Sequence, residues 1–198
     1  MNKSFKIRKM VMITILSVLA IVLQLFSNYV QFGPVSITLS LIPIVVGAIL
    51  YGPVAGFIIG SVCGLIVFVA PGTIGLFWPY GVFTTFLVCV LKMGLAGFVS
   101  GLLYKLFASK NKKFAVALSS VIVPLVNTGL FALAAYLFYY DLLASYAPSG
   151  QAVVAYLFLG FIGFNFLIEF FVNSVLSPVV LRLVNMANDK FDLNEQEN

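Results

Sequence analysis

Residues 82–107, VFTTFLVCVLKMGLAGFVSGLLYKLF, decide how the rest of the sequence is interpreted. Before Lys105, near its end, this stretch carries a single charged residue, Lys92. It is also longer than the ~20 apolar residues that a helix needs to cross ~30 Å of hydrocarbon. The stretch therefore predicts a transmembrane helix with a lysine in its interior.

Similar apolar stretches on both sides predict an all-α membrane protein with six transmembrane helices in one integral membrane domain, residues 1–198. Of the 198 residues, 62% are hydrophobic and 9% are charged, against ~25% charged in soluble domains. Six helices of ~20 residues leave room only for short connections and tails, so no soluble catalytic domain is expected. The predicted spans are 10–29, 37–50, 54–69, 82–107, 114–138 and 152–184, between a short basic segment (1–9) and a polar tail (185–198).

Three details of these spans are also predicted. The first apolar run is longer than the core of a signal peptide and lacks a small-residue cleavage site, so we expect it to stay as a membrane helix. Residues 37–50 are short for a full crossing, and part of the preceding loop is expected to enter the membrane while shielded by protein. Residues 70–81, rich in Gly, Pro and aromatic residues, are expected to form a loop.

The charges predict the orientation. Ten of the eleven basic residues lie in the N-terminal segment, around residues 105–113, or near the C-terminus. The three loops on the other side carry one charge, Asp141. Because Lys and Arg gather in cytoplasmic segments, both termini are predicted to be cytoplasmic. The net charge of +5 is thus attributed to topology, and no nucleic-acid partner is expected.

The composition excludes several kinds of active site. The sequence has no histidine, which removes His-based triads, metal sites and proton relays. It also lacks the G-x-x-x-x-G-K-[ST] motif, so the chain cannot hydrolyse ATP by the P-loop mechanism. Cys63 and Cys89 both lie in apolar runs and are predicted to be core residues. We therefore expect neither an enzyme nor a cofactor or metal site.

Polar residues inside predicted spans indicate a second feature. Lys92 and Glu169 each cost ~2.5–3.5 kcal/mol near the bilayer centre, so each must face protein or water. Asn165, Glu169 and Asn173 recur every fourth residue on one helix face, and Asn127 lies in the fifth span. Two interpretations are open: a structural Lys92–Glu169 ion pair, or a polar cavity between the last three helices that binds a small polar solute.

Aromatic and glycine residues have alternative roles as well. Phe77, Trp78 and Tyr80 form either a belt at the membrane interface or a lid over a bound ligand. The glycines spaced four apart allow close helix contact, either inside the bundle or with another membrane protein. These glycines are Gly56, Gly60 and Gly64 in the third span and Gly97 and Gly101 in the fourth. Three tyrosines, Tyr139, Tyr140 and Tyr146, are assigned to the belt at the membrane interface.

Over roughly residues 8–186, the chain resembles the substrate-binding (S) components of energy-coupling factor (ECF) vitamin transporters. The similarity rests on four stretches: the basic start with MVMI (10–13), IPIVVGAILYGPVAG (42–56), KMGLAG (92–97) and the segment from Asn165 to Pro178. It implies a six-helix domain in the bacterial plasma membrane, in contact with membrane lipid. A vitamin site near the outer face would be closed by the loops after spans one and three.

The resemblance also implies protein partners, a membrane coupling subunit and two cytoplasmic ATPases. In this family the first helix often carries an A-x-x-x-A pair that contacts the coupling subunit. Thr14 and Val18 occupy the matching positions here, with Ser17 nearby, and Val18 departs from the small-residue pattern.

The candidate substrate-binding residues are the polar residues inside the predicted spans, including the polar stripe of residues 165, 169 and 173, and the aromatic segment of residues 77–80. Lys92 suits a carboxylate, and the amides and Glu169 suit hydroxyl or amide groups, which favours pantothenate. A heterocyclic vitamin that stacks on Trp78 and Phe77 is the alternative substrate. A scaffold of the six-span cell-shape type, or an unaided channel, is the alternative function. The full set is Lys92, Asn127, Asn165, Glu169, Asn173, Trp78, Phe77 and Tyr80.

Overall fold

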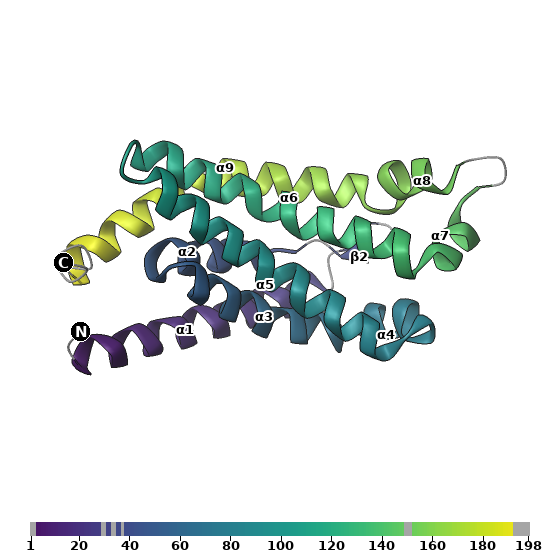
Figure 1. The fold of residues 1–198 in the computed structure, drawn as a ribbon, viewed down its shortest axis with the longest axis horizontal. Coiled ribbons are helices and arrows are strands. Elements are labelled where there is room, and N and C mark those ends of the chain that lie inside the picture. The colour runs from purple at the N-terminus through teal and green to yellow at the C-terminus, as the bar shows by residue number, and fades with distance from the viewer. Residues whose placement is uncertain (1–2, 29–30, 33–34, 37, 149–151, 192–198) are drawn as a thin grey trace.

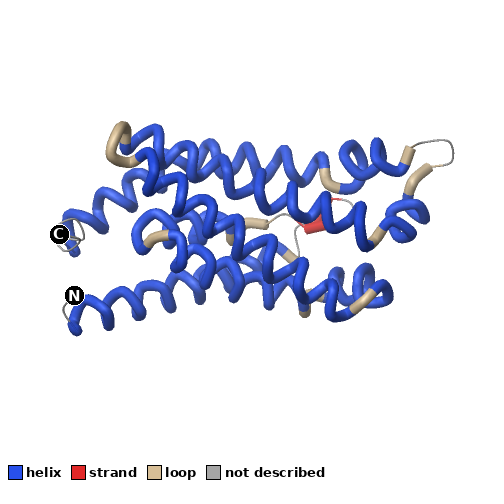
Figure 2. Tube along the Cα trace, in the orientation of Figure 1, coloured by secondary structure: helices blue, strands red, loops and turns tan. Residues whose placement is uncertain are grey.

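The computed structural model describes residues 3–28, 31–32, 35–36, 38–148 and 152–191, and nearly all of them are helical (Figures 1 and 2). The long helices run along the long axis of an elongated bundle (Figure 1). The main helices are α1 (Lys3–Ser27), α2 (Leu41–Tyr51), α3 (Pro53–Phe68), α5 (Val82–Phe107), α6 (Lys112–Phe138) and α9 (Gly163–Phe191). The short elements are β1 (Gln31–Phe32), β2 (Val35–Ser36), α4 (Pro71–Phe77), a 3-10 turn (Trp78–Tyr80), α7 (Tyr140–Tyr146), α8 (Val153–Tyr156) and a π-helical turn (Leu157–Phe161), and β1 pairs with β2 antiparallel.

Four helices of the described chain are long and apolar enough to cross a membrane, and the bent pair formed by α3 and α4 makes a fifth if it counts as one span. These four are Ile7–Ser27, Val82–Phe107, Lys112–Phe138 and Val153–Ala187. The second predicted span contains α2, whose 11 residues cover only ~16 Å. The structure is therefore a multi-pass bundle, and the count of six full spans stays a prediction.

The turn between α2 and α3 explains how the short helix fits. Gly52 has a φ of 90°, a value that glycine adopts at little cost. Pro53 follows at the first position of α3, where its fixed φ suits a helix start and its missing N–H is not needed. Two helices therefore meet at this tight turn, between the predicted spans 37–50 and 54–69.

Residues 70–81 are not the predicted loop. They form α4 and a 3-10 turn, bent by 70° from α3. Pro71 starts this helix after an extended Ala70, and Gly81, with a φ of 139°, ends the turn before α5. The Pro and Gly residues that predict a loop thus mark the two ends of a short helical segment.

The last helix extends beyond residue 184, the predicted end of the sixth span, into the segment predicted as a polar tail. Helix α9 continues to Phe191, because the sequence from Leu181 onward contains neither Gly nor Pro to stop it. Residues 192–198 lie outside the described part of the chain.

Helices α3 and α5 meet along a seam of small residues. A Cβ atom added to Gly56 would collide with the backbone of Gly97, and one added to Gly60 would collide with the Met93 carbonyl group. Gly64 lies equally close to the backbone of Cys89. The glycines therefore serve internal packing, the first of the two roles that their spacing allows.

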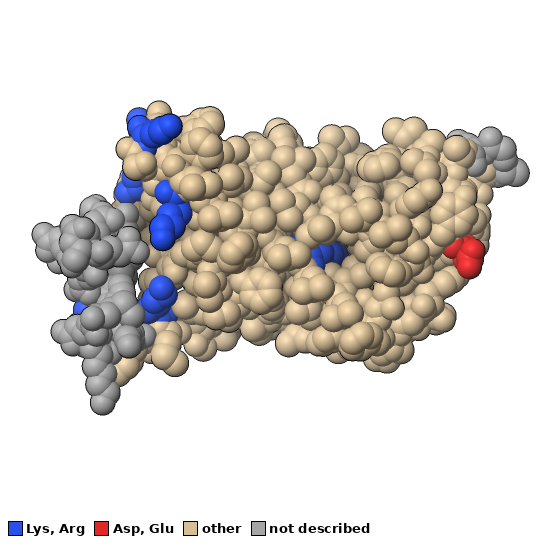
Figure 3. All heavy atoms as spheres, viewed as in Figure 1, with Lys and Arg blue, Asp and Glu red and all other residues tan. Residues whose placement is uncertain are grey.

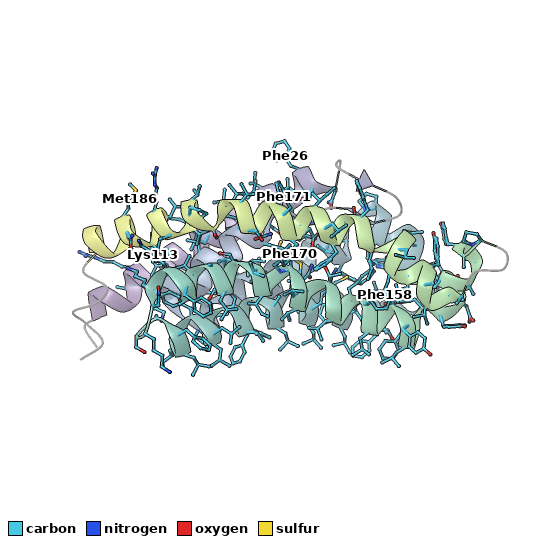
Figure 4. All side chains as sticks on the ribbon, turned by 90° about the horizontal axis from the view of Figure 1, so that it is seen from above. Phe26, Lys113, Phe158, Phe170, Phe171 and Met186 are labelled. Carbon is cyan, nitrogen blue, oxygen red and sulfur yellow. The ribbon has the colours of Figure 1, made fainter. Side chains whose placement is uncertain are left out.

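The surface agrees with a membrane setting. Large apolar side chains such as Phe26, Phe171 and Met186 are exposed on the outside of the bundle (Figure 4). The start of α1 and the end of α9 lie at the same end of the molecule (Figure 1), and most of the basic side chains visible in Figure 3 gather there. Helix α7, which carries Asp141 in its first turn, lies at the opposite end of the molecule (Figure 1).

Candidate functional site

A cavity of about 370 Å³ lies between the helices. Its walls come from the C-terminal halves of α1, α3 and α6 and the N-terminal halves of α5 and α9, with α4 beside them. Those helix halves lie away from the basic end of the bundle. The polar residues in the wall are Gln24, Asn28, Thr38, Thr73, Thr85, Lys92, Asn127, Thr128, Tyr139, Asn165 and Glu169.

Lys92 is a half-buried cation in this wall. Its Nζ lies 4.7 Å from the ring centroid of Phe131, a distance typical of a cation–π contact. Within the described ranges, Lys92 forms no ion pair with any carboxylate. The structural Lys92–Glu169 ion pair, one of the two interpretations of the sequence, is therefore not formed.

Glu169 instead hydrogen-bonds to the backbone of a neighbouring segment. Glu169 is 4% exposed, and its Oε1 accepts a hydrogen bond of 2.7 Å from the backbone N–H of Thr38. Glu169 thus joins α9 to residue 38, and both residues belong to the cavity wall.

The next two residues are held by α1. The backbone N–H of Leu39 donates to Ser27 Oγ at 3.0 Å, and Ser40 Oγ donates to Gln24 Oε1 at 2.7 Å. Cys63 Sγ also lies 3.8 Å from the same Gln24 oxygen. Because Thr38 and Ser40 are buried and residues 38–40 are hydrogen-bonded to protein groups, the start of the second predicted span can lie within the bundle without water. Entry of the preceding loop into the membrane stays a prediction.

Only part of the polar stripe of α9 lines the cavity. Asn165 and Glu169 line the cavity, as does Asn127 of α6, which is 3% exposed. Asn173 does not line it, and its Nδ2 donates to the backbone carbonyl of Glu169 at 2.8 Å. The spacing of the stripe therefore predicts the face of the helix correctly but not where along it the cavity ends.

The aromatic segment contributes one of its three predicted residues. Phe77 is in the wall, with edge contacts to Phe131 and Tyr139 at centroid distances of 5.8 and 5.0 Å. Trp78 stacks on Phe68 at 5.1 Å, and its Nε1 donates to the Phe68 carbonyl group at 3.3 Å. Tyr80 is exposed. Trp78 and Tyr80 are therefore outside the lining, and Trp78 braces the bend between α3 and α4.

Several residues of the wall were not predicted. Tyr139, assigned to the interfacial belt, is 1% exposed and hydrogen-bonds to Thr85 at 2.9 Å. Gln24 is buried in the first span, and a polar residue inside that apolar run is a signal that could have identified it. Thr38 gave no such signal, because its place depends on a contact with a residue more than a hundred positions away.

The predicted docking residues lie on two faces of α1. Thr14 and Val18 are exposed, and Val18 is surrounded by other exposed apolar side chains. Ser17 is buried and donates to the Ile13 carbonyl group at 2.8 Å. Only Thr14 and Val18 can therefore meet a partner on this face.

Residues 8–181 match the family model described as ECF transporter, substrate-specific component. The chain belongs to this family. No curated protein matches the chain. As an S component it is a multi-pass membrane protein that binds the small substrate of a transporter and is not an enzyme. Proteins of this family work with an ECF module made of a coupling subunit and ATPases.

Proposed function

We propose that this S component binds a small vitamin with a carboxylate group, and that pantothenate is its substrate. The observation that carries the proposal is the ammonium group of Lys92, which faces the cavity and has no ion-pair partner within the described ranges. A cation in a membrane domain costs ~2.5–3.5 kcal/mol at insertion. A carboxylate from the ligand would offset that cost and form charge-assisted hydrogen bonds.

The size and lining of the cavity favour a compact, hydroxylated solute. Ligand pockets range from ~300 to ~1,000 Å³, so a cavity of about 370 Å³ lies near the small end. Asn127, Asn165 and Thr128 offer hydrogen-bonding groups along its wall. A heterocycle is less well served, because Trp78 is stacked on Phe68 and is not part of the lining.

Glu169 supports binding through the wall in this proposal. Its carboxyl group holds the backbone of Thr38, so the wall keeps its shape at the segment after α1. In this proposal Lys92 binds the carboxylate of the ligand, and Glu169 holds the wall segment at Thr38 in place. Asn173 acts one turn further along, through its bond to the Glu169 carbonyl group.

We further propose that both termini are cytoplasmic and that the cavity receives its ligand from outside. The gathering of basic side chains at the end that holds the termini supports this orientation. In the proposal, import is powered by two cytoplasmic ATPases, and the coupling subunit contacts α1 at Thr14 and Val18. The chain alone would bind the vitamin but accumulate it only together with that module.

The test is binding of a panel of vitamins to the purified full chain, measured by isothermal titration. Pantothenate should bind the wild type and Lys105→Met, a control that removes a cation at the far end of α5. Binding of riboflavin or folate without pantothenate would refute the proposed substrate. Failure of every vitamin in the panel would favour a scaffold function.

A further inference from the structure

We infer that Tyr139 is a specificity-determining residue whose hydroxyl oxygen accepts a hydrogen bond from the solute. The inference deepens the proposed function and rests on it for the position of the anionic end. It starts from Thr85 of α5, a residue that is 1% exposed and lies in the cavity wall. Together with Tyr139, Thr85 forms a hydroxyl pair between α5 and the end of α6.

Three oxygen atoms surround the Thr85 hydroxyl group. The Gly81 carbonyl oxygen is 2.8 Å away, the Phe77 carbonyl oxygen is 3.2 Å away, and the Tyr139 hydroxyl oxygen is 2.9 Å away. A threonine hydroxyl carries one hydrogen, and a carbonyl oxygen carries none. The Thr85 hydrogen must point toward the carbonyl oxygens, since otherwise two acceptors would face each other without a proton between them.

This arrangement fixes the direction of the remaining bond. With the Thr85 hydrogen directed at a carbonyl group, the hydrogen of the Tyr139 hydroxyl donates to Thr85 Oγ1. Tyr139 then has no hydrogen left for a ligand, but its oxygen keeps acceptor capacity. Within the described residues, no donor bonds to that oxygen. This end of the cavity can therefore accept a hydrogen bond from a hydroxyl or amide N–H group and cannot donate one through Tyr139.

The Tyr139 oxygen can discriminate between solutes, because binding a solute that leaves it without a hydrogen bond costs free energy. The aromatic rings of Phe77 and Tyr80 pack around Tyr139, which is 1% exposed. A buried acceptor without a donor loses its hydration and gains nothing in return. A solute with a hydrogen atom or methyl group at this point would leave the acceptor unsatisfied, and a hydroxyl group would satisfy it.

The distance from Lys92 sets the length of the solute. Thr85 and Lys92 are seven residues apart on α5, which is ~10 Å along the axis and nearly two full turns, so both lie on one face. Pantothenate carries its carboxylate and terminal hydroxyl group at opposite ends. Its extended chain spans roughly 10 Å, judged from the reach of about three extended residues. The cavity thus fits an anion at one end and a donor at the other.

The test uses two matched probes and pantothenate with the full chain in detergent. γ-Hydroxybutyryl-β-alanine has the chain length of pantothenate, and butyryl-β-alanine lacks only its terminal hydroxyl group. Binding is measured by the ligand-dependent shift in the thermal unfolding midpoint and by titration. The variants are Tyr139→Phe, Thr85→Val and a control, Tyr80→Phe, which changes a neighbouring exposed tyrosine outside the lining.

The wild type should bind the hydroxylated probe more tightly than the deoxy probe, by about 2- to 10-fold for one neutral hydrogen bond. Tyr139→Phe should bind the two probes equally, and Tyr80→Phe should keep the wild-type preference. Thr85→Val leaves the Tyr139 oxygen able to accept and should keep the preference for the hydroxylated probe, which separates the role of Tyr139 from that of Thr85. The unfolding midpoint of each ligand-free variant shows that it is folded.

The outcomes separate this inference from the proposed substrate. If pantothenate fails to bind but the hydroxylated probe is preferred through Tyr139, the substrate proposal is wrong and the inference holds. If pantothenate binds and Tyr139→Phe keeps the preference, the inference is wrong and the substrate proposal holds. If neither pantothenate nor either probe binds, both are wrong.

Discussion

The two faces of α5 differ in what they bury. One face packs against α3 through glycines, and this contact leaves no gap for even one added carbon at Gly60 of α3 or Gly97 of α5. The other face carries Thr85, Cys89 and Lys92 to a cavity of about 370 Å³. In lipid, close backbone packing is a main source of helix association, so the first face stabilises the bundle. The second face can then keep polar groups and open space that stability alone would not favour.

The largest effect on stability is expected when a side chain is added at the glycine contact between α3 and α5. Gly60→Val places a side chain against the Met93 backbone, which cannot move away as a flexible side chain can. We expect a loss of about 3 kcal/mol or more in the free energy of unfolding. Thermal unfolding in detergent measures it. A Gly60→Val protein as stable as the wild type would show that the α3–α5 seam is loose.

Gly129→Ala is the matched control for that substitution. Gly129 lies within α6 and has nothing within 4 Å of an added Cβ. Because alanine is favoured over glycine in a helix interior by about 1 kcal/mol, the variant should be as stable as the wild type or slightly more so.

An intermediate effect is expected at Glu169. Glu169→Ala leaves the buried N–H of Thr38 without its acceptor, at a cost of about 1–3 kcal/mol in stability. Glu169→Gln keeps an acceptor oxygen in the same place and should lose less. Unfolding and pantothenate titration of both variants measure the effect. If Glu169→Gln is as damaging as Glu169→Ala, the negative charge matters more than the bond to Thr38.

The smallest effect is expected at Trp78, the only tryptophan. Its ring stacks on Phe68 and lies outside the cavity lining, so a bound ligand should change its fluorescence little. Trp78→Phe should bind pantothenate within about twofold of the wild type, because stacking on Phe68 is retained in kind. Strong quenching of Trp78 by the ligand would instead support the lid interpretation of the aromatic segment.

The sequence predicts continuous features well. The ends of α5 agree with the predicted span because a long apolar run is bounded by Gly81 at one end and polar residues at the other. The polar face of α9 follows from helical spacing alone. Such features depend on neighbouring residues and can be derived from local patterns.

Features that depend on distant contacts could not be predicted. From the sequence alone Tyr139 is assigned to the belt, because its contact with Thr85 forms only when α6 packs against α5. Thr38 enters the wall only through Glu169, and α4 replaces a loop because Pro71 and Gly81 delimit it rather than disrupt it. The existence of a polar site follows from the cost of charges in lipid, but the membership of its wall requires the fold.

The central claim is that Lys92 is the charge partner of the ligand and not of Glu169. The most direct measurement compares the affinity of pantothenate with that of panthenol, its neutral alcohol, for the wild type and Lys92→Met. The wild type should prefer the carboxylate by about 10- to 150-fold, the equivalent of ~1.5–3 kcal/mol for a charged hydrogen bond. Lys92→Met should remain folded and bind both solutes alike. A Lys92→Met protein that keeps the preference, or that loses the ~3–5 kcal/mol of stability expected from a broken buried ion pair, would contradict the claim.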